Sequence, residues 1–348
     1  MGGSALERAG ADVVQASDGL SVMGFSEVLR ILPTVARARR NLVDFMEQEE
    51  VDLFVPIDFP GFNSGLAKKA KGRGVPVFWL IAPQVWAWGS WRIPGFRRRI
   101  DRLGTLLPFE KHFFSERGFD VFPMGHPLMD DYDTGFPFAA ARDRREAHLN
   151  DPRHPLVIGI FPGSRRQELD HLLPVLRVTS QAIIGLLPDR EVRFVVSSAP
   201  GVDPLRLSEA FQTGSEVSQD PLPKLMEVVD LALVCSGTAS LEAALAGVPH
   251  ELVYRTGGLN YFLGKRLVKT PFIGLSNLIM DKPMVREHVQ GQAKPLSLAQ
   301  ALLRWLARPA ERQQFFDDAR NLRQMCGQAG VWDRTAVDIL DFLVTRDR

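Results

Sequence analysis

The chain has 348 residues, more than one hydrophobic core usually serves, so we expect two domains. Its 42 Lys and Arg residues almost balance 41 Asp and Glu residues, which leaves a formal net charge of +1. This balance excludes the overall basic field that indicates nucleic acid as a partner, so any basic function must be local. Cys235 and Cys326 are the only cysteines and form no CxxC or Cys/His cluster, so we predict no disulfide framework and no metal site.

No segment of the sequence is predicted to span a membrane. No secretory signal opens the chain, and its longest uncharged apolar stretch, residues 75–88, is too short to cross a bilayer. With so few cysteines, the composition predicts a cytoplasmic protein.

The first part of the chain alternates helical and strand-like patterns, which favours a parallel sheet with helices on its faces. The predicted elements are a helix at 25–49, a strand at 51–57, a helix at 64–71, and strands at 75–81 and 103–107, followed by a helix at 109–117 and a short strand at 120–122.

A polar segment between His126 and Pro155 predicts a domain boundary, after which the alternation resumes. Strands are predicted at 156–161, 192–197, 231–235 and 251–254, and the tail from 296 to 348 is helical. We therefore expect an α/β fold of two Rossmann-like domains with a cleft between them. The domains are an N-terminal one at 1–150, a second at 151–330, and a C-terminal helix at 331–348.

Two strand–turn–helix segments in the second domain are candidate phosphate sites. Residues 233–249 pass from an apolar run through Ser236, Gly237 and Thr238 into small helix-forming residues, and 161–168 (FPGSRRQE) have the same layout. Amides at a helix N-terminus suit an anion, and Arg165 offers a planar fork of donors. Alone, the first segment is better explained as a turn capped by Ser236, Thr238 or Ser240, and the second as a surface turn. As a pair, they favour one diphosphate held by Gly163, Ser164 and Arg165 together with the first turn.

A carboxylate follows the first predicted strand, in residues 57–63 (IDFPGFN). At the carboxyl end of a strand, Asp58 can act as a general base on a substrate hydroxyl. Asp58 can instead cap the helix that follows, and the sequence supports the general-base and helix-cap interpretations about equally.

Aromatic and basic residues interleave after the strand at 75–81, beginning with residues 82–88 (APQVWAW). Single tryptophans are usually core, and neighbouring arginines usually form a solvated helix face. As a cluster they predict a membrane-facing patch on the acceptor side, because aromatic rings favour the headgroup boundary and arginines favour anionic lipid. The residues concerned are Trp86, Trp88, Trp91, Phe96, Arg92, Arg97, Arg98, Arg99 and Arg102, with Tyr261, Phe262, Lys265, Arg266 and Lys269 as a second group.

In chain order, these segments resemble lipid-A-disaccharide synthases, glycosyltransferases of the two-domain GT-B type. The two most specific segments are APQVWAW and IDFPGFN. The others are residues 20–24 (LSVMG), 108–110 (PFE), 125–127 (GHP), FPGSRRQE, 236–245 (SGTASLEAAL), 265–269 (KRLVK) and 276–278 (SNL).

The resemblance implies transfer of a 2,3-diacylglucosamine unit from UDP to the 6-hydroxyl of 2,3-diacylglucosamine 1-phosphate, with inversion and release of UDP. Asp58 would be the base, and Arg165 would hold the donor phosphates. Ser236, Gly237 and Thr238 would cradle the diphosphate, with Ser240 in the same turn. Glu242 would accept hydrogen bonds from the ribose or uracil, and Asn277 would lie near the donor. No cofactor or metal is implied, and the partners would be the donor, the acceptor, an anionic membrane surface on the inner face of the inner membrane, and a second copy through the C-terminal region.

The start of the chain departs from the family pattern. The family begins with a strand and a Gly-Glu-x-Ser-Gly-Asp loop, for which this sequence has no counterpart, so we expect an incomplete N-terminal domain. Met280, Asp281 and Lys282 stand where the family often has Ala-Gly-Arg. The alternatives are an inactive UDP-binding remnant, another GT-B enzyme, or a UDP-sugar epimerase.

Overall fold

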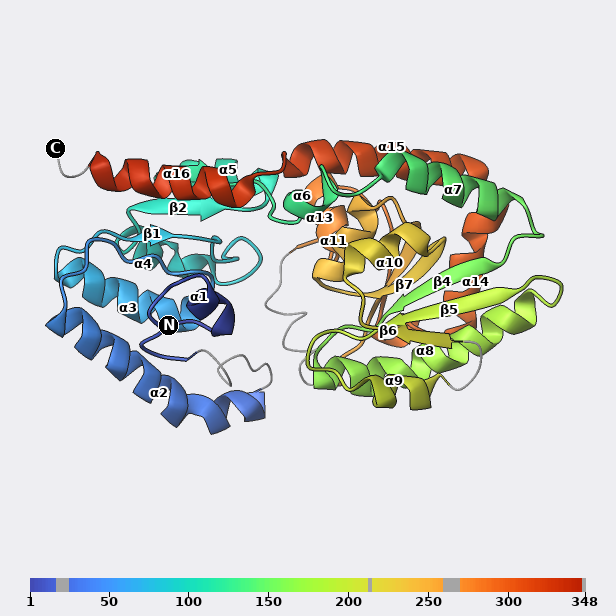
Figure 1. The fold of residues 1–348 in the computed structure, drawn as a ribbon, viewed down its shortest axis with the longest axis horizontal. Coiled ribbons are helices and arrows are strands. Elements are labelled where there is room, and N and C mark those ends of the chain that lie inside the picture. Colours follow the sequence, from blue (N-terminus) through green and yellow to red (C-terminus); the bar gives the residue numbers. More distant parts are fainter. Residues whose placement is uncertain (17–24, 212–214, 259–269, 346–348) are drawn as a thin grey trace. The chain divides into compact units, whose positions relative to one another are not determined.

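The structure is a computed structural model that describes residues 1–16, 25–211, 215–258 and 270–345, without the side chains of Ser4 and 25–31. It divides into two compact units (Figure 1). Unit 1 comprises Met1–Met124 and Trp332–Arg348, and unit 2 comprises Gly125–Val331. The residues of the LSVMG motif from 20 to 24, and those of the second basic group between 261 and 269, lie outside the described residues.

Unit 2 is built on a six-stranded parallel sheet in the order β6-β5-β4-β7-β8-β9. This is the doubly wound arrangement in which the strand order reverses between two neighbouring central strands, here β4 and β7. The strands are β4 (Leu156–Phe161), β5 (Val192–Ser197), β6 (Ser215–Ser218), β7 (Leu231–Cys235), β8 (His250–Tyr254) and β9 (Arg286–Val289).

Helices cover both faces of this sheet (Figure 1). One group, α8, α9 and α14, packs together, and α10, α11, α13 and α15 form a second group. The helices of unit 2 are α6 (Met129–Tyr132), α7 (Phe138–Asn150), α8 (Arg166–Leu186), α9 (Pro204–Ala210), α10 (Leu222–Val228), α11 (Thr238–Leu245), α13 (Leu275–Met280), α14 (Pro295–Ala307) and α15 (Pro309–Cys326).

Helix α7 belongs to unit 2 because two of its arginines, Arg144 and Arg145, bind there. The fully buried Arg145 donates to the carbonyl oxygens of Val229 (2.8 Å), Ala246 (2.9 Å) and Met226. Arg144 pairs with the buried Asp230 at 2.9 Å. By its contacts the chain therefore changes unit at residue 124, before the polar segment, whereas the sequence suggested a boundary near residue 150.

Unit 1 holds a smaller parallel sheet, β1-β2-β3. Its strands are β1 (Phe78–Trp79), β2 (Arg102–Thr105) and β3 (Val121–Pro123), and its helices are α1 (Ser4–Arg8), α2 (Phe25–Gln48), α3 (Pro60–Gly72), α4 (Ile93–Arg97), α5 (Pro108–Ser115) and α16 (Val331–Val344). The strand predicted at 51–57 forms only two isolated parallel bridges, Phe54 with Val77 and Ile57 with Leu80. The segment nevertheless runs beside β1, so its end lies next to the end of that strand.

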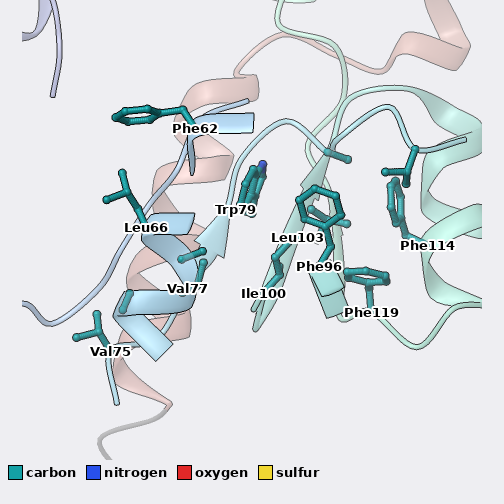
Figure 2. Close-up of a cluster of buried hydrophobic side chains, with 14 of the residues drawn as sticks. Phe62, Leu66, Val75, Val77, Trp79, Phe96, Ile100, Leu103, Phe114 and Phe119 are labelled. Atoms are coloured by element: carbon teal, nitrogen blue, oxygen red, sulfur yellow. The ribbon is translucent and has the colours of Figure 1, made fainter. Parts of the chain in front are cut away.

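The core of unit 1 is aromatic (Figure 2). Phe62 and Leu66 of α3 lie on one side of Trp79, and Leu103 and Phe96 lie on its other side. The rings of Trp79 and Phe96 meet edge to face, with 5.7 Å between centroids. This packing fixes the short strands whose ends carry the polar motifs.

Helix α16 closes unit 1 although it is the last helix in the sequence. Arg102 of β2 donates to both carboxylate oxygens of Asp338 at 2.7 and 2.6 Å, and also to Asp120 at 2.9 Å. Phe342 meets Phe78 edge to face at 5.5 Å. The predicted helical tail is therefore confirmed, and its last segment supports the first unit rather than standing apart.

Candidate functional site

Both predicted phosphate turns of unit 2 lie at its switch point. The turn after β4 and the turn after β7 leave the carboxyl ends of adjacent strands, since Phe161 pairs with Val234. A ligand in a doubly wound sheet binds at this position, because helices leaving on opposite faces open a crevice between the two turns.

The first turn, Pro162–Arg165, leads into the N-terminus of α8, whose first amides receive no side-chain cap. Gly163 has φ +92°, and Ser164 and Arg165 are exposed. The Arg165 side chain pairs with Glu168 at 2.9 Å. An exposed guanidinium beside uncapped amides is an arrangement that can hold an anion.

The second turn, Ser236–Gly237, leads into α11, which also lacks a side-chain cap. The capping interpretation is therefore not supported here. Ser240 is buried and donates its hydroxyl to the Gly237 carbonyl at 2.7 Å, so it braces the turn. Gly237, with φ +148° and ψ −161°, and Thr238 are exposed. That backbone conformation is essentially restricted to glycine.

The two turns contact each other through Cys235. A Cβ on Gly163 would lie 3.3 Å from the Cys235 sulfur and 2.8 Å from an oxygen of Glu168. Burial raises the pKa of the Cys235 thiol to about 12, so it stays neutral and serves as packing. The close fit requires glycine and sets the spacing of the two helix N-termini.

Glu242 lies one turn into α11, with only 7% of its surface exposed. It accepts a hydrogen bond from the hydroxyl of the buried Tyr132 at 2.9 Å. Burial raises the pKa of Glu242 to about 7, although the Tyr132 hydrogen bond opposes the shift. Sequence reasoning missed Tyr132, and nothing in its local sequence connects it with Glu242, 110 residues away.

Asn277 is fully buried in α13, and its amide is satisfied within the protein. It donates to the Val285 carbonyl and to Glu287, both at 2.9 Å, and accepts from the Val285 amide at 3.0 Å. Glu287 in turn accepts from the amides of Ile273 and Gly274. The side chain of Asn277 therefore holds the loop around Glu287 together.

Lys282 stands where the family often has an arginine. Its ammonium pairs with Asp318 of α15 at 2.7 Å, and Asp318 is 5% exposed. Lys282 therefore connects α13 to α15.

The carboxyl edge of the unit 1 sheet brings IDFPGFN and APQVWAW together. The Asp58 amide donates to the carbonyl of Leu80 at 2.9 Å, and Leu80 is two residues before the start of APQVWAW. Asp58 and Phe59 both have φ +44°, and Ile81 has φ +63°. Strained backbone at non-glycine residues is concentrated at functional sites.

The helix-capping interpretation of Asp58 is not supported. The N-cap of α3 is Phe59, and no side chain caps that helix. Asp58 is exposed, and partial desolvation raises the pKa of its carboxyl despite a hydrogen bond from the Phe59 amide. Asn63 fixes the bend by donating to the Ile57 and Asp58 carbonyls at 3.2 and 2.8 Å. A carboxylate held in this way is available to take a proton.

Glu110, from the PFE motif, joins Trp86 to the chain that follows β2. It is 2% exposed and accepts hydrogen bonds from the indole of Trp86 at 2.9 Å and from the amides of Leu106 and Leu107 at 3.0 Å. Burial raises the pKa of its carboxyl. Trp86 is therefore positioned by Glu110.

The predicted aromatic and basic patch divides into core and surface. Phe96 is core, and Arg102 is committed to Asp338 and Asp120, so neither is available to a membrane. Arg99 donates to Ser64. Trp91 and Trp88 are 72% and 42% exposed, and the remaining exposed arginines are Arg97 and Arg98, with Arg92 over the Trp88 ring.

Among the described residues, no group of three or more His, Cys, Asp or Glu side chains could hold a metal ion. No helix in the part of the chain that the structure describes is long and apolar enough to cross a membrane.

A family profile for lipid-A-disaccharide synthetase matches residues 1–331. The lipid-A-disaccharide synthase of Geobacter sulfurreducens is 33% identical over 346 residues, which cover 99% of this chain and 88% of that one. The chain belongs to the lipid-A-disaccharide synthase family.

Solved structures share the GT-B fold. A calicheamicin glycosyltransferase matches with a TM-score of 0.58 at 17% identity, covering 98% of this chain and 88% of that chain. A UDP-GlcNAc 2-epimerase from Neisseria meningitidis, solved with UDP-GlcNAc, matches with a TM-score of 0.54 at 12% identity, covering 98% and 90%. Membership of the lipid-A-disaccharide synthase family makes this chain a glycosyltransferase of lipid A biosynthesis, with a UDP-sugar donor and a lipid acceptor.

Proposed function

We propose that the chain transfers 2,3-diacylglucosamine from UDP to the 6-hydroxyl of 2,3-diacylglucosamine 1-phosphate, forming a β-1,6 disaccharide and UDP. The observation that carries the proposal is the pair of uncapped helix N-termini at the switch point of unit 2, with Arg165 beside them. Charge develops on the diphosphate as the sugar leaves, and fixed amides and a guanidinium stabilise it without a metal.

The proposed roles follow from the environment of each residue. Arg165, Ser164, Gly163, Ser236, Gly237 and Thr238 bind the diphosphate, and Ser240 shapes their turn. Glu242 accepts from the ribose or uracil, and Asn277 acts by holding the loop around Glu287. Asp58 removes the proton of the acceptor hydroxyl, which attacks the anomeric carbon from the face opposite the leaving UDP, so the configuration inverts.

The diphosphate site is tested by comparing Arg165→Ala with Arg166→Ala in UDP titrations. Both side chains are exposed on consecutive residues, so the change in net charge is the same. We expect Arg165→Ala to lose roughly 10–100-fold in UDP affinity, from about 1.5–3 kcal/mol for a charged hydrogen bond, and Arg166→Ala to lose little. Equal effects would remove the proposed role of Arg165.

The alternatives predict different behaviour. An inactive remnant would bind UDP without transferring the sugar. An epimerase would interconvert a UDP-sugar in the absence of any lipid acceptor. Activity that requires both acylated sugars would exclude both the inactive remnant and the epimerase.

We further propose that the protein works in the cytoplasm, on the inner face of the inner membrane, through Trp88, Trp91, Arg97 and Arg98. Both substrates carry acyl chains, which supports a position at a bilayer. Aromatic rings favour the headgroup boundary, and each arginine near an anionic surface contributes about 1 kcal/mol. Sedimentation with anionic vesicles should weaken steeply with added salt. Salt-insensitive binding would count against this surface.

A homodimer through the C-terminal region is also proposed. Val337, Leu340 and Val344 of α16 are 57%, 61% and 57% exposed, and their spacing puts them on one helix face. Burying such a stripe against a second copy would be favourable. Light scattering should give the mass of a dimer for the wild type and of a monomer for Leu340→Asp. A wild-type monomer would refute the proposal.

A further inference from the structure

A hollow of about 720 Å³ lies on unit 1 where α4 and α5 end. Its lining residues are Ile93, Pro94, Arg97, Arg98, Arg117 and Gly118, and we call it the arginine pocket. Half of these six residues are arginines, and no carboxylate is among them. Three guanidinium groups around one hollow favour an anionic ligand.

Two of the three arginines are held in place by neighbouring groups. Arg97 donates through Nε to the Gly118 carbonyl at 3.2 Å, which leaves its two terminal nitrogens for other partners. Arg117 donates to the Phe113 carbonyl at 2.7 Å, and its guanidinium lies 3.8 Å from the centroid of the Phe113 ring. Gly118, with φ +76°, is packed so closely that a Cβ would lie 2.8 Å from Arg97 Nε.

Arg98 is exposed, and among the described residues its side chain makes no hydrogen bond or ion pair. Glu116 lies 3.8 Å from Arg117 and is itself 3.1 Å from His112. The carboxyl ends of α4 and α5 add about half a negative charge each, so the positive charge of three arginines still dominates.

The arginine pocket lies at the amino edge of the sheet, away from Asp58. Arg98 precedes β2 by four residues and Gly118 precedes β3 by three, whereas Asp58 lies beside the carboxyl end of β1. The strands run parallel, so the arginine pocket and Asp58 lie at opposite edges of the sheet.

We propose that the arginine pocket binds the phosphate of an anionic phospholipid headgroup. The inference rests on the proposed membrane association and adds to it a defined site for a single lipid. Planar guanidinium groups bind phosphate oxygens in pairs, which makes the contact specific for phosphate and not only for negative charge. Trp91, three residues before Pro94 in the sequence, is 72% exposed, so its ring is free to enter the headgroup boundary.

The test compares phosphatidylcholine vesicles that contain phosphatidylglycerol with vesicles given the same surface charge by a fatty acid. Replacing both Arg98 and Arg117 by Ser should weaken binding to phosphatidylglycerol roughly thirtyfold. Replacing both Arg98 and Arg117 by Lys keeps the positive charge and removes the paired donors of the guanidinium groups. This variant should bind phosphatidylglycerol vesicles more weakly than the wild type, and fatty-acid vesicles equally well. Arg73→Ser, an exposed residue outside the pocket, is the control and should change binding only slightly.

Each other outcome is decisive. If the Lys variant binds both kinds of vesicle like the wild type, binding depends on positive charge alone and not on guanidinium geometry, and the proposal is overturned. Inorganic phosphate that competes at the concentration of the lipid phosphate would assign the site to free phosphate instead. Wild-type protein that binds neither vesicle would refute both the pocket and the membrane association. Transfer between detergent-dispersed substrates would then still test the proposed reaction separately.

Discussion

Gly163→Ala tests the phosphate turn through a single methyl group. Gly163 has φ +92°, a conformation that costs an L-residue about 1–2 kcal/mol. Its new Cβ would lie 2.8 Å from Glu168 Oε2 and 3.3 Å from the Cys235 sulfur. Since Glu168 holds Arg165 at 2.9 Å, making room for the methyl group displaces the guanidinium as well.

The variant Gly201→Ala separates the backbone cost of a positive φ from the steric cost of the added methyl group. Gly201 has φ +81°, and a Cβ there would meet nothing within 4 Å, so this variant carries the backbone cost alone. Gly163→Ala adds the steric cost and the loss of an exposed ion pair, which is worth less than about 1 kcal/mol. We expect Gly163→Ala to be less stable than Gly201→Ala by about 1–2 kcal/mol.

The assay is urea unfolding together with UDP titration of both variants. Gly201→Ala should bind UDP like the wild type, because Gly201 follows β5 and not either of the two strands, β4 and β7, that form the switch point. Gly163→Ala should bind at least about tenfold more weakly, a loss of about 1.4 kcal/mol. If Gly163→Ala binds UDP as tightly as Gly201→Ala, this turn does not hold the diphosphate and the reasoning is refuted.

Asp58→Asn should keep UDP affinity and lose about 10²–10⁴ in turnover, because an amide takes no proton; turnover within severalfold of wild type would place the base elsewhere. Because burial raises the Glu242 pKa from 4.5 to about 7, its contribution to stability is complete below pH 4.5 and lost as the pH rises through 7. Unfolding at several pH values should show wild type losing up to about 3 kcal/mol relative to Glu242→Gln over that window, and parallel curves would contradict the shift. Arg312→Ala should cost about 3–5 kcal/mol, since the fully buried Arg312 pairs with Glu146 at 2.8 Å, and a loss below 1 kcal/mol in urea unfolding would disprove this.

The sequence predicted the buried strands of unit 2 well and its edges poorly. Leu156–Phe161, Val192–Ser197 and Leu231–Cys235 are continuous apolar runs or nearly so, and the structure has strands with those same bounds. The edge strands β6 (SEVS) and β9 (REHV) are polar, so no hydrophobic pattern marks them. Hydrophobic periodicity reports burial, and edge strands are buried least.

The candidate site was predictable where its residues directly follow a strand in the sequence. Gly163, Ser236 and Gly237 follow strands directly, so topology alone brings them to one edge. The capping alternatives could not be decided from sequence, because Asp58 as base and Asp58 as cap use the same spacing. The pairs Tyr132 with Glu242 and Arg102 with Asp338 join residues more than 100 positions apart, and only the folded packing shows them.

The most direct test of the proposed function is transfer itself. Purified protein is incubated with UDP-2,3-diacylglucosamine and 2,3-diacylglucosamine 1-phosphate, and the products are identified by mass spectrometry and by the anomeric proton coupling. We expect a β-1,6-linked disaccharide 1-phosphate and an equal amount of UDP, formed only when both substrates are present. UDP binding without disaccharide, or release of UDP that does not depend on the acceptor, would contradict it.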